Sequence, residues 1–84
     1  MKKVLVKYRG SLTFLTGTQE ETLEASTVGE LLKSIRKNYG REAEKTARAM
    51  LIAVNGKSIL LLKRYKTALE DGDLVNFFPL SGGG

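Results

Sequence analysis

The first part of the chain carries patterns of apolar and polar residues that are typical of two strands. In residues 3–9, the positions that share one side of an extended chain are Val4, Val6 and Tyr8. Residues 20–25 form a second predicted strand, whose glutamates favour a sheet edge that is protected against unwanted pairing. We expect the two strands to pair as a hairpin, with residues 11–16 between them as a loop or short extension.

A helical pattern follows at residues 28–39. The apolar stripe consists of Val28, Leu31, Leu32, Ile35 and Tyr39, at helical spacing. Thr27 and Glu30 have the spacing of a capping box, in which each side chain satisfies a backbone N–H at a helix start. We therefore predict a helix that begins after Thr27, followed by a short helical turn within residues 41–48.

The second half of the chain predicts three further strands. Residues 50–55 are largely apolar and lead into Asn55-Gly56, a pair that readily adopts the positive φ angles of a tight hairpin turn. Residues 58–62 are predicted to return as a short fourth strand. The last strand, residues 74–78, follows an Asp-Gly-Asp turn and ends at Pro79.

Together these elements predict an α+β fold, in which a mixed sheet of four to five strands is covered on one face by one main helix. A chain of 84 residues has room for a single domain, which we expect to span residues 1–80. Residues 81–84 are Ser-Gly-Gly-Gly, and we predict a flexible tail there because glycine has no side chain to pack.

The residue types that the chain lacks narrow its chemistry. It has no cysteine and no histidine, which excludes a disulfide framework and removes the usual zinc ligands, nucleophilic thiol and general base. We therefore predict no metal site and no catalytic activity. The net charge of +5 favours acidic partners, but it comes without a motif of specific nucleic-acid binding. No apolar run approaches the ~20 residues that cross a bilayer, so we expect no membrane contact and a cytoplasmic location.

The glycine-rich end can carry chemistry of its own. A chain without Cβ atoms can enter a narrow channel, and the five residues from Leu80 to Gly84 span about 17 Å when extended. That length would bring the terminal carboxylate into the active site of a partner. The alternative is a frayed end without a reactive role, as in a plain interaction module.

Several stretches of the sequence occur in a particular order before these glycines. They are Thr27-Val28-Gly29-Glu30-Leu31-Leu32, Val54-Asn55-Gly56 and Ala68-Leu69-Glu70-Asp71-Gly72-Asp73-Leu74-Val75-Asn76-Phe77-Phe78-Pro79. In this order and spacing the chain resembles the ubiquitin-like sulfur carriers with the β-grasp fold (MoaD/ThiS-like), especially the small subunit of molybdopterin synthase.

The resemblance implies a role for the last residues. A ubiquitin-activating-type adenylating enzyme would charge Gly84 with ATP, and Gly84 would then become a thiocarboxylate. Gly82 and Gly83 would extend the tail into the large subunit of molybdopterin synthase, which would use the sulfur to build the dithiolene that holds molybdenum or tungsten. ATP would be bound by the adenylating enzyme, and this chain would bind no cofactor.

For partner binding, the resemblance places Phe78, Pro79 and Leu80 where the domain passes into its tail. We also assign Leu60 and Leu62 to a partner-binding patch, because apolar residues exposed near a functional tail often mark one. The alternative for these two leucines is that they complete the small core.

The chain departs from the family pattern in two places. A single Pro79 stands where the family often has two prolines, and three closing glycines replace the usual two. Gly84 is therefore either retained, which we favour, or removed before activation. Other functions remain open: a ubiquitin-like modifier joined through Gly84 to lysines of other proteins, and a sulfur carrier for thiamine or tRNA thiolation.

Overall fold

One mixed sheet organises the molecule in the computed structural model, which describes residues 2–80. Its strands are β1 (Lys3–Lys7), β2 (Glu20–Glu24), β3 (Leu51–Val54), β4 (Lys57–Ser58) and β5 (Leu74–Phe78). Within the described residues their spatial order is β2-β1-β5-β3-β4. The central pair, β1 and β5, is parallel, and the other neighbours are antiparallel. The predicted hairpin of β1 with an edge strand β2 is therefore confirmed.

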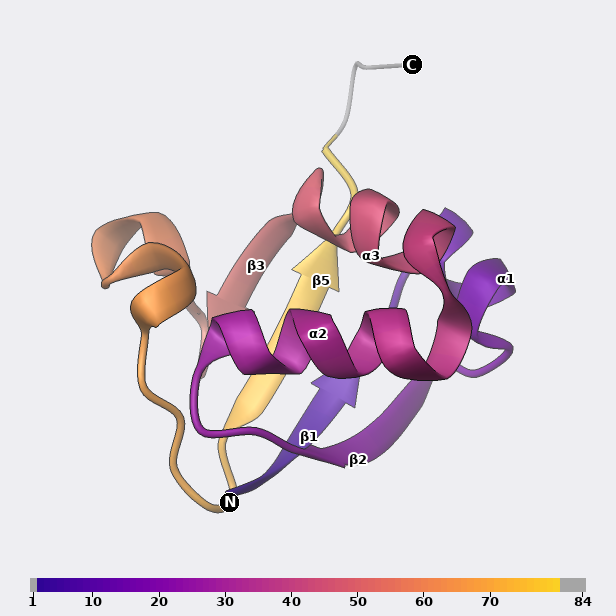
Figure 1. Cartoon of the computed structure of the whole chain (residues 1–84). Coiled ribbons are helices and arrows are strands. Elements are labelled where there is room, and N and C mark those ends of the chain that lie inside the picture. The colour runs from indigo at the N-terminus through magenta and orange to yellow at the C-terminus, as the bar shows by residue number, and fades with distance from the viewer. Residues whose placement is uncertain (1, 81–84) are drawn as a thin grey trace.

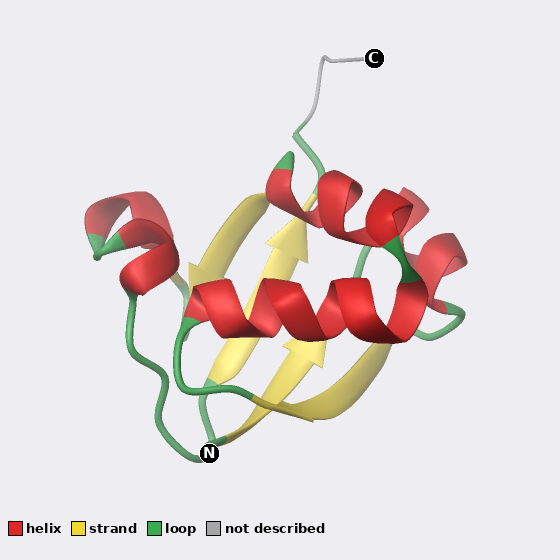
Figure 2. Cartoon of the chain, viewed as in Figure 1, coloured by secondary structure: helices red, strands yellow, loops and turns green. Residues whose placement is uncertain are grey.

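Helices lie on one face of this sheet (Figures 1 and 2). The predicted main helix is α2 (Val28–Tyr39), and α3 (Arg41–Arg48) is a full helix where only a short turn is predicted. A third helix, α1 (Ser11–Thr16), and two short 3-10 turns, η1 (Ile59–Leu61) and η2 (Arg64–Lys66), complete the elements of residues 2–80. The predicted α+β architecture is confirmed, with α1 and α3 added to the single expected helix.

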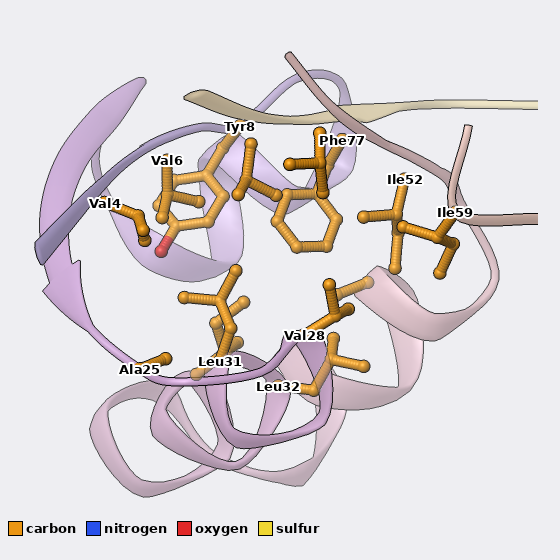
Figure 3. Packing of buried hydrophobic residues seen from close by; sticks show 14 of the residues in the cluster. Val4, Val6, Tyr8, Ala25, Val28, Leu31, Leu32, Ile52, Ile59 and Phe77 are labelled. Atoms are coloured by element: carbon orange, nitrogen blue, oxygen red, sulfur yellow. The ribbon is translucent and has the colours of Figure 1, made fainter. Parts of the chain in front are cut away.

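The core lies between the sheet and α2 (Figure 3). The alternation predicted for β1 is confirmed, because Val4, Val6 and Tyr8 are each at most 3% exposed. They face Leu31 and Leu32 of the α2 stripe, which are both fully buried. Burying one such leucine contributes roughly 1.5–3 kcal/mol, so the sheet and this helix depend on each other for stability.

The start of α2 is capped almost as predicted. The Glu30 N–H donates to Thr27 Oγ1 (3.1 Å), which is one half of the capping box. The other half differs, because the Glu30 carboxylate accepts from the N–H of Ser26 (2.8 Å), one residue before the cap. Both bonds satisfy backbone donors that would otherwise be unpaired at the helix start.

The prediction of a loop or short extension at residues 11–16 is wrong, since this segment is helix α1. Leu12 and Thr16 lie one helical turn apart and are both buried, and Leu15 also packs against the core. The Thr16 hydroxyl donates to the Leu12 carbonyl (2.9 Å), so the polar side chain is satisfied inside the helix. Tertiary packing thus overrides the weak local pattern.

The predicted fourth strand at residues 58–62 is wrong beyond its first residue. Ser58 belongs to the short strand β4, and the turn at Asn55-Gly56 has the positive φ angles expected, 52° and 84°. The Ser58 side chain then accepts from the N–H of Leu60 (3.1 Å) and caps η1. This local bond competes with ladder pairing and turns the chain away from β3.

Candidate functional site

The candidate site is the place where the chain leaves the sheet after β5. Strand β5 lies between β1 and β3, so hydrogen bonds hold it on both sides. Val75 and Phe77 are buried in the core, as predicted, and alternation places Phe78 on the opposite face. There Phe78 is half-buried and lies opposite Leu51 of β3 in the ladder. The last described residues therefore follow the middle strand of the sheet.

Arg9, in the loop that follows β1, holds the aromatic ring of Phe78. Its guanidinium carbon lies 4.9 Å from the centroid of that ring, and its Nη2 donates to Asn76 Oδ1 at 3.0 Å. A cation–π contact at a partly exposed site contributes roughly 0.5–1 kcal/mol. The contact fixes the Phe78 ring and leaves a positive charge beside the start of the tail.

Gly10 makes room for Pro79. A Cβ atom on Gly10 would lie 2.8 Å from the Pro79 Cγ, closer than real Cβ contacts allow, and Gly10 has a φ of 61°. Only glycine can adopt this φ angle and also fit beside Pro79 without strain. The loop after β1 and the residue after β5 therefore pack against each other and set the direction in which the chain leaves.

Leu80, which is 64% exposed, lies over an apolar groove of about 200 Å³. The groove runs between β3, the end of α3 and the turns η1 and η2, which are orange in Figure 1. Its apolar lining includes Met50, Leu51, Ile52, Ile59, Leu60, Tyr65 and Leu80, and its charged members are Arg48 and Arg64. An open apolar surface thus adjoins the point of exit.

Contacts with Tyr65 and Glu44 hold the side chain of Arg48 in this groove. Its guanidinium carbon lies 4.9 Å from the Tyr65 ring centroid, and its Nη2 donates to Glu44 Oε2 at 3.1 Å. The hydrogen bond to Glu44 raises the pKa of Arg48, so the side chain remains a cation. The positive charge at the groove is therefore permanent at physiological pH.

The structure places the predicted site residues in two groups. Leu60 lines the same groove as Leu80, whereas Leu62 lies outside it, beside Thr67 and Ala68. The alternative that these leucines complete the core is wrong: Leu60 is 59% exposed and Leu62 37%, while the preceding Ile59 is buried. The tail residues Gly82, Gly83 and Gly84 lie outside the described residues, so the tail and the domain boundary at residue 80 remain predictions.

Sequence reasoning missed several residues that shape this site. No local sequence pattern marks Arg9 and Gly10 as site residues, because their contacts with Phe78 and Pro79 join segments about 70 positions apart in the chain. For Leu51, the sequence offered only its position near the start of a predicted apolar strand, which does not mark it as a site residue. Tyr65 and Arg48 meet only because the turn η2 folds back towards α3.

Two further kinds of feature were sought among the described residues, a cluster of metal ligands and a membrane-spanning helix. Residues 2–80 contain no group of three or more acidic, histidine or cysteine side chains that could hold a metal ion. In the same range, no helix has the length and apolar character needed to span a bilayer.

Comparison with known proteins identifies the family. The model described as "ThiS family" matches residues 6–84, which is nearly the whole chain. The chain belongs to the ThiS family. The match confirms the resemblance to the ubiquitin-like sulfur carriers, and it includes the closing glycines. No curated protein matches this ThiS-family chain.

Solved structures similar to this ThiS-family chain share its β-grasp fold. The small archaeal modifier protein 1 of Methanosarcina acetivorans is 26% identical, with a TM-score of 0.88, and the match covers 100% of this chain and 98% of that one. A putative molybdopterin converting factor, subunit 1, from Pyrococcus furiosus is 28% identical, with a TM-score of 0.72 and coverage of 94% and 98%.

A third similar structure is a protein–protein complex of subunits 1 and 2 of the molybdopterin-converting factor from Helicobacter pylori. That chain is 22% identical, with a TM-score of 0.69 and coverage of 98% and 99%, and at this identity the likeness concerns the fold alone. The ubiquitin-like fold therefore occurs both in a protein named as a modifier and in molybdopterin-converting factors.

Proposed function

We propose that this chain is a noncatalytic sulfur carrier and the small subunit of a molybdopterin synthase. The observation that carries the proposal is the ThiS-family match, which extends beyond the end of β5 as far as Gly84. The exposed Pro79 and Leu80 support it, because they bring the chain to the outside of the domain just before the closing glycines. The proposed location is the cytoplasm, since the reaction consumes ATP.

The proposed chemistry takes place on Gly84. Its carboxylate attacks the α-phosphorus of ATP in the adenylating enzyme, which forms an acyl-adenylate and releases pyrophosphate. A donor at the oxidation level of sulfide then attacks the acyl carbon, the bond to AMP breaks, and a thiocarboxylate remains. Neither step needs a nucleophile or base from this chain, which agrees with its lack of cysteine and histidine.

The proposed sulfur acceptor is a pterin precursor bound by the large subunit. The identity of 28% to a putative molybdopterin converting factor subunit supports this choice over thiamine or tRNA thiolation. Phe78, Pro79 and Leu80 would contact the large subunit as the tail enters it, together with Leu60 and Leu62. This chain would bind no cofactor of its own, and ATP would stay with the adenylating enzyme.

Intact-mass spectrometry tests the carrier function. Incubation with the adenylating enzyme of the same genome, ATP and a sulfide donor should raise the mass of the chain by about 16 Da, as sulfur replaces one oxygen. The same mixture without ATP should leave the mass unchanged. An unchanged mass with an enzyme that performs ATP–pyrophosphate exchange on another carrier would refute the proposal.

A second candidate function is that of a ubiquitin-like modifier. The structural similarity to a small archaeal modifier protein favours it, and modification would begin with the same adenylation of Gly84. Peptide mass spectrometry should then find target lysines that carry an isopeptide bond to Gly84. If cells with an active pathway contain no such peptides, the carrier function alone remains.

A further inference from the structure

Two residues of the loop after β1 contact the end of β5. Arg9 donates to Asn76 Oδ1 at 3.0 Å and lies over the ring of Phe78, with 4.9 Å between its guanidinium carbon and the ring centroid. Gly10 leaves the space that Pro79 occupies, since a Cβ atom at position 10 would lie 2.8 Å from the Pro79 Cγ. Positions 76, 78 and 79 are thus each contacted by this loop as the chain leaves the sheet.

Asn76 is an unusual residue for its place in the sheet. It lies in the middle strand, opposite Lys7 of β1 and Ala53 of β3, and is only 8% exposed. Residues with branched or aromatic side chains favour such a position, whereas asparagine is depleted in strands. Residues that break a local rule occur most often at functional sites. The pairing of Asn76 with Arg9 therefore points to a use beyond stability.

Arg9 is suited to join these residues of β5. It is exposed and lies outside the apolar core, and none of the four ion pairs found within residues 2–80 includes it. A guanidinium is planar, so it can stack on an aromatic ring while it donates in its own plane to another group. One side chain thus binds both Asn76 and Phe78 to the loop.

We propose that Arg9 and Gly10 are positioning residues for the chemistry on Gly84: they hold residues 76–79 in one arrangement, so that the chain enters the active site of a partner from a fixed starting point. The inference rests on the proposed function, because it concerns the delivery of Gly84. Both residues act through residues 76–79, while the reacting groups belong to Gly84 and the partner. The effect is therefore the same for every partner that receives the tail.

Positioning predicts which kinetic constant changes. A partner that has bound the folded domain holds the tail either outside or inside its active site, and only the second complex reacts. Binding of the domain then sets KM, whereas the fraction of complexes with the tail inside sets kcat when that fraction is small. Loosening of residues 76–79 lowers this fraction, because each complex must find an orientation that the wild type already has.

ATP–pyrophosphate exchange by the adenylating enzyme, at varied carrier concentration, tests Arg9. A cation–π contact at an exposed site shifts an equilibrium about 2–5-fold, so Arg9→Ala should lower kcat by about this factor and leave KM nearly unchanged. Arg9→Lys should keep most of the loss, since it restores the charge without the planar guanidinium. Arg41→Ala is the matched control: it removes the same charge from the exposed start of α3 and should keep the wild-type kcat.

Asn76→Val separates positioning from stability. Valine suits a middle strand, so the free energy of unfolding in urea should stay at the wild-type value or rise. The loss of the acceptor for Arg9 should nevertheless lower kcat about 2-fold or more. The double variant of Arg9→Ala and Asn76→Val should lose no more than Arg9→Ala alone, because the two residues form one contact. A purely structural role does not produce a variant that is as stable as the wild type and slower.

The outcomes distinguish this inference from the carrier function. Adenylation of the wild type together with an unchanged kcat for Arg9→Ala or Asn76→Val overturns the inference and leaves the carrier function intact. A full return of kcat in Arg9→Lys also overturns it, because charge alone then suffices, and so does a raised KM at unchanged kcat, which means that Arg9 contacts the enzyme directly. If an enzyme that is active on another carrier does not adenylate the wild type, the carrier function fails, and this inference fails with it.

Discussion

At the scale of single residues, one carboxylate joins three elements of the fold. Glu21 of β2 accepts hydrogen bonds from the hydroxyl of Tyr8, just after β1 (2.5 Å), and from that of Tyr39 in α2 (2.8 Å). Burial, reinforced by the hydrogen bond to Glu21, raises the pKa of Tyr39 to about 12, and the same causes raise the pKa of Tyr8 further. Both hydroxyls therefore stay protonated and keep donating.

Tyr39→Phe tests this cluster. Loss of the hydrogen bond should lower the free energy of unfolding by about 1–2 kcal/mol. As pH rises above about 10, the unfolded tyrosine releases its proton before the folded one does, so the wild type should lose stability between pH 10 and about 12. The variant should show a shallower decline in urea unfolding at several pH values across this window. Equal slopes for the two proteins would show that Tyr39 does not contribute.

At the scale of elements, helix α1 follows β1, and its N-cap residue Gly10 packs against Pro79 after β5. The glycines at its two ends differ in what a side chain would meet: Gly10 has a φ of 61° and faces Pro79, while Gly17 has a φ of 76° and faces open space. Gly10→Ala should therefore cost about 2–3 kcal/mol, and Gly17→Ala about 1 kcal/mol. Urea unfolding of both variants measures the difference. Equal losses would mean that the contact with Pro79 does not constrain the chain.

At the scale of the whole molecule, fold and proposed chemistry occupy separate parts of the chain. Every fully buried large side chain that the structure describes lies between Val4 and Phe77. Deletion of Gly83 and Gly84 should therefore leave the thermal midpoint unchanged while it abolishes adenylation. Differential scanning fluorimetry and the intact-mass assay measure the two effects. Unchanged function in cells after this deletion would favour a plain interaction module.

Elements with strong local patterns could be predicted from the sequence. The stripe of α2, the capping pair Thr27 and Glu30 and the turn at Asn55-Gly56 depend on residues at most a few turns apart. Such patterns survive in any tertiary context, because the burial of one face and the satisfaction of local backbone donors favour the same conformation. The family resemblance likewise rested on short stretches and their order.

The sequence by itself determined the α+β architecture, the apolar faces of its main elements and the glycine end with its candidate chemistry, and its resemblance to a known family added the β-grasp fold. Only the tertiary structure decided that residues 11–16 coil into a helix, that Arg9 and Gly10 support the chain's exit at Phe78 and Pro79, and that Leu60 lines the same groove as Leu80. The physical reason is that these features arise from contacts between residues far apart in the chain, where packing outweighs local propensity.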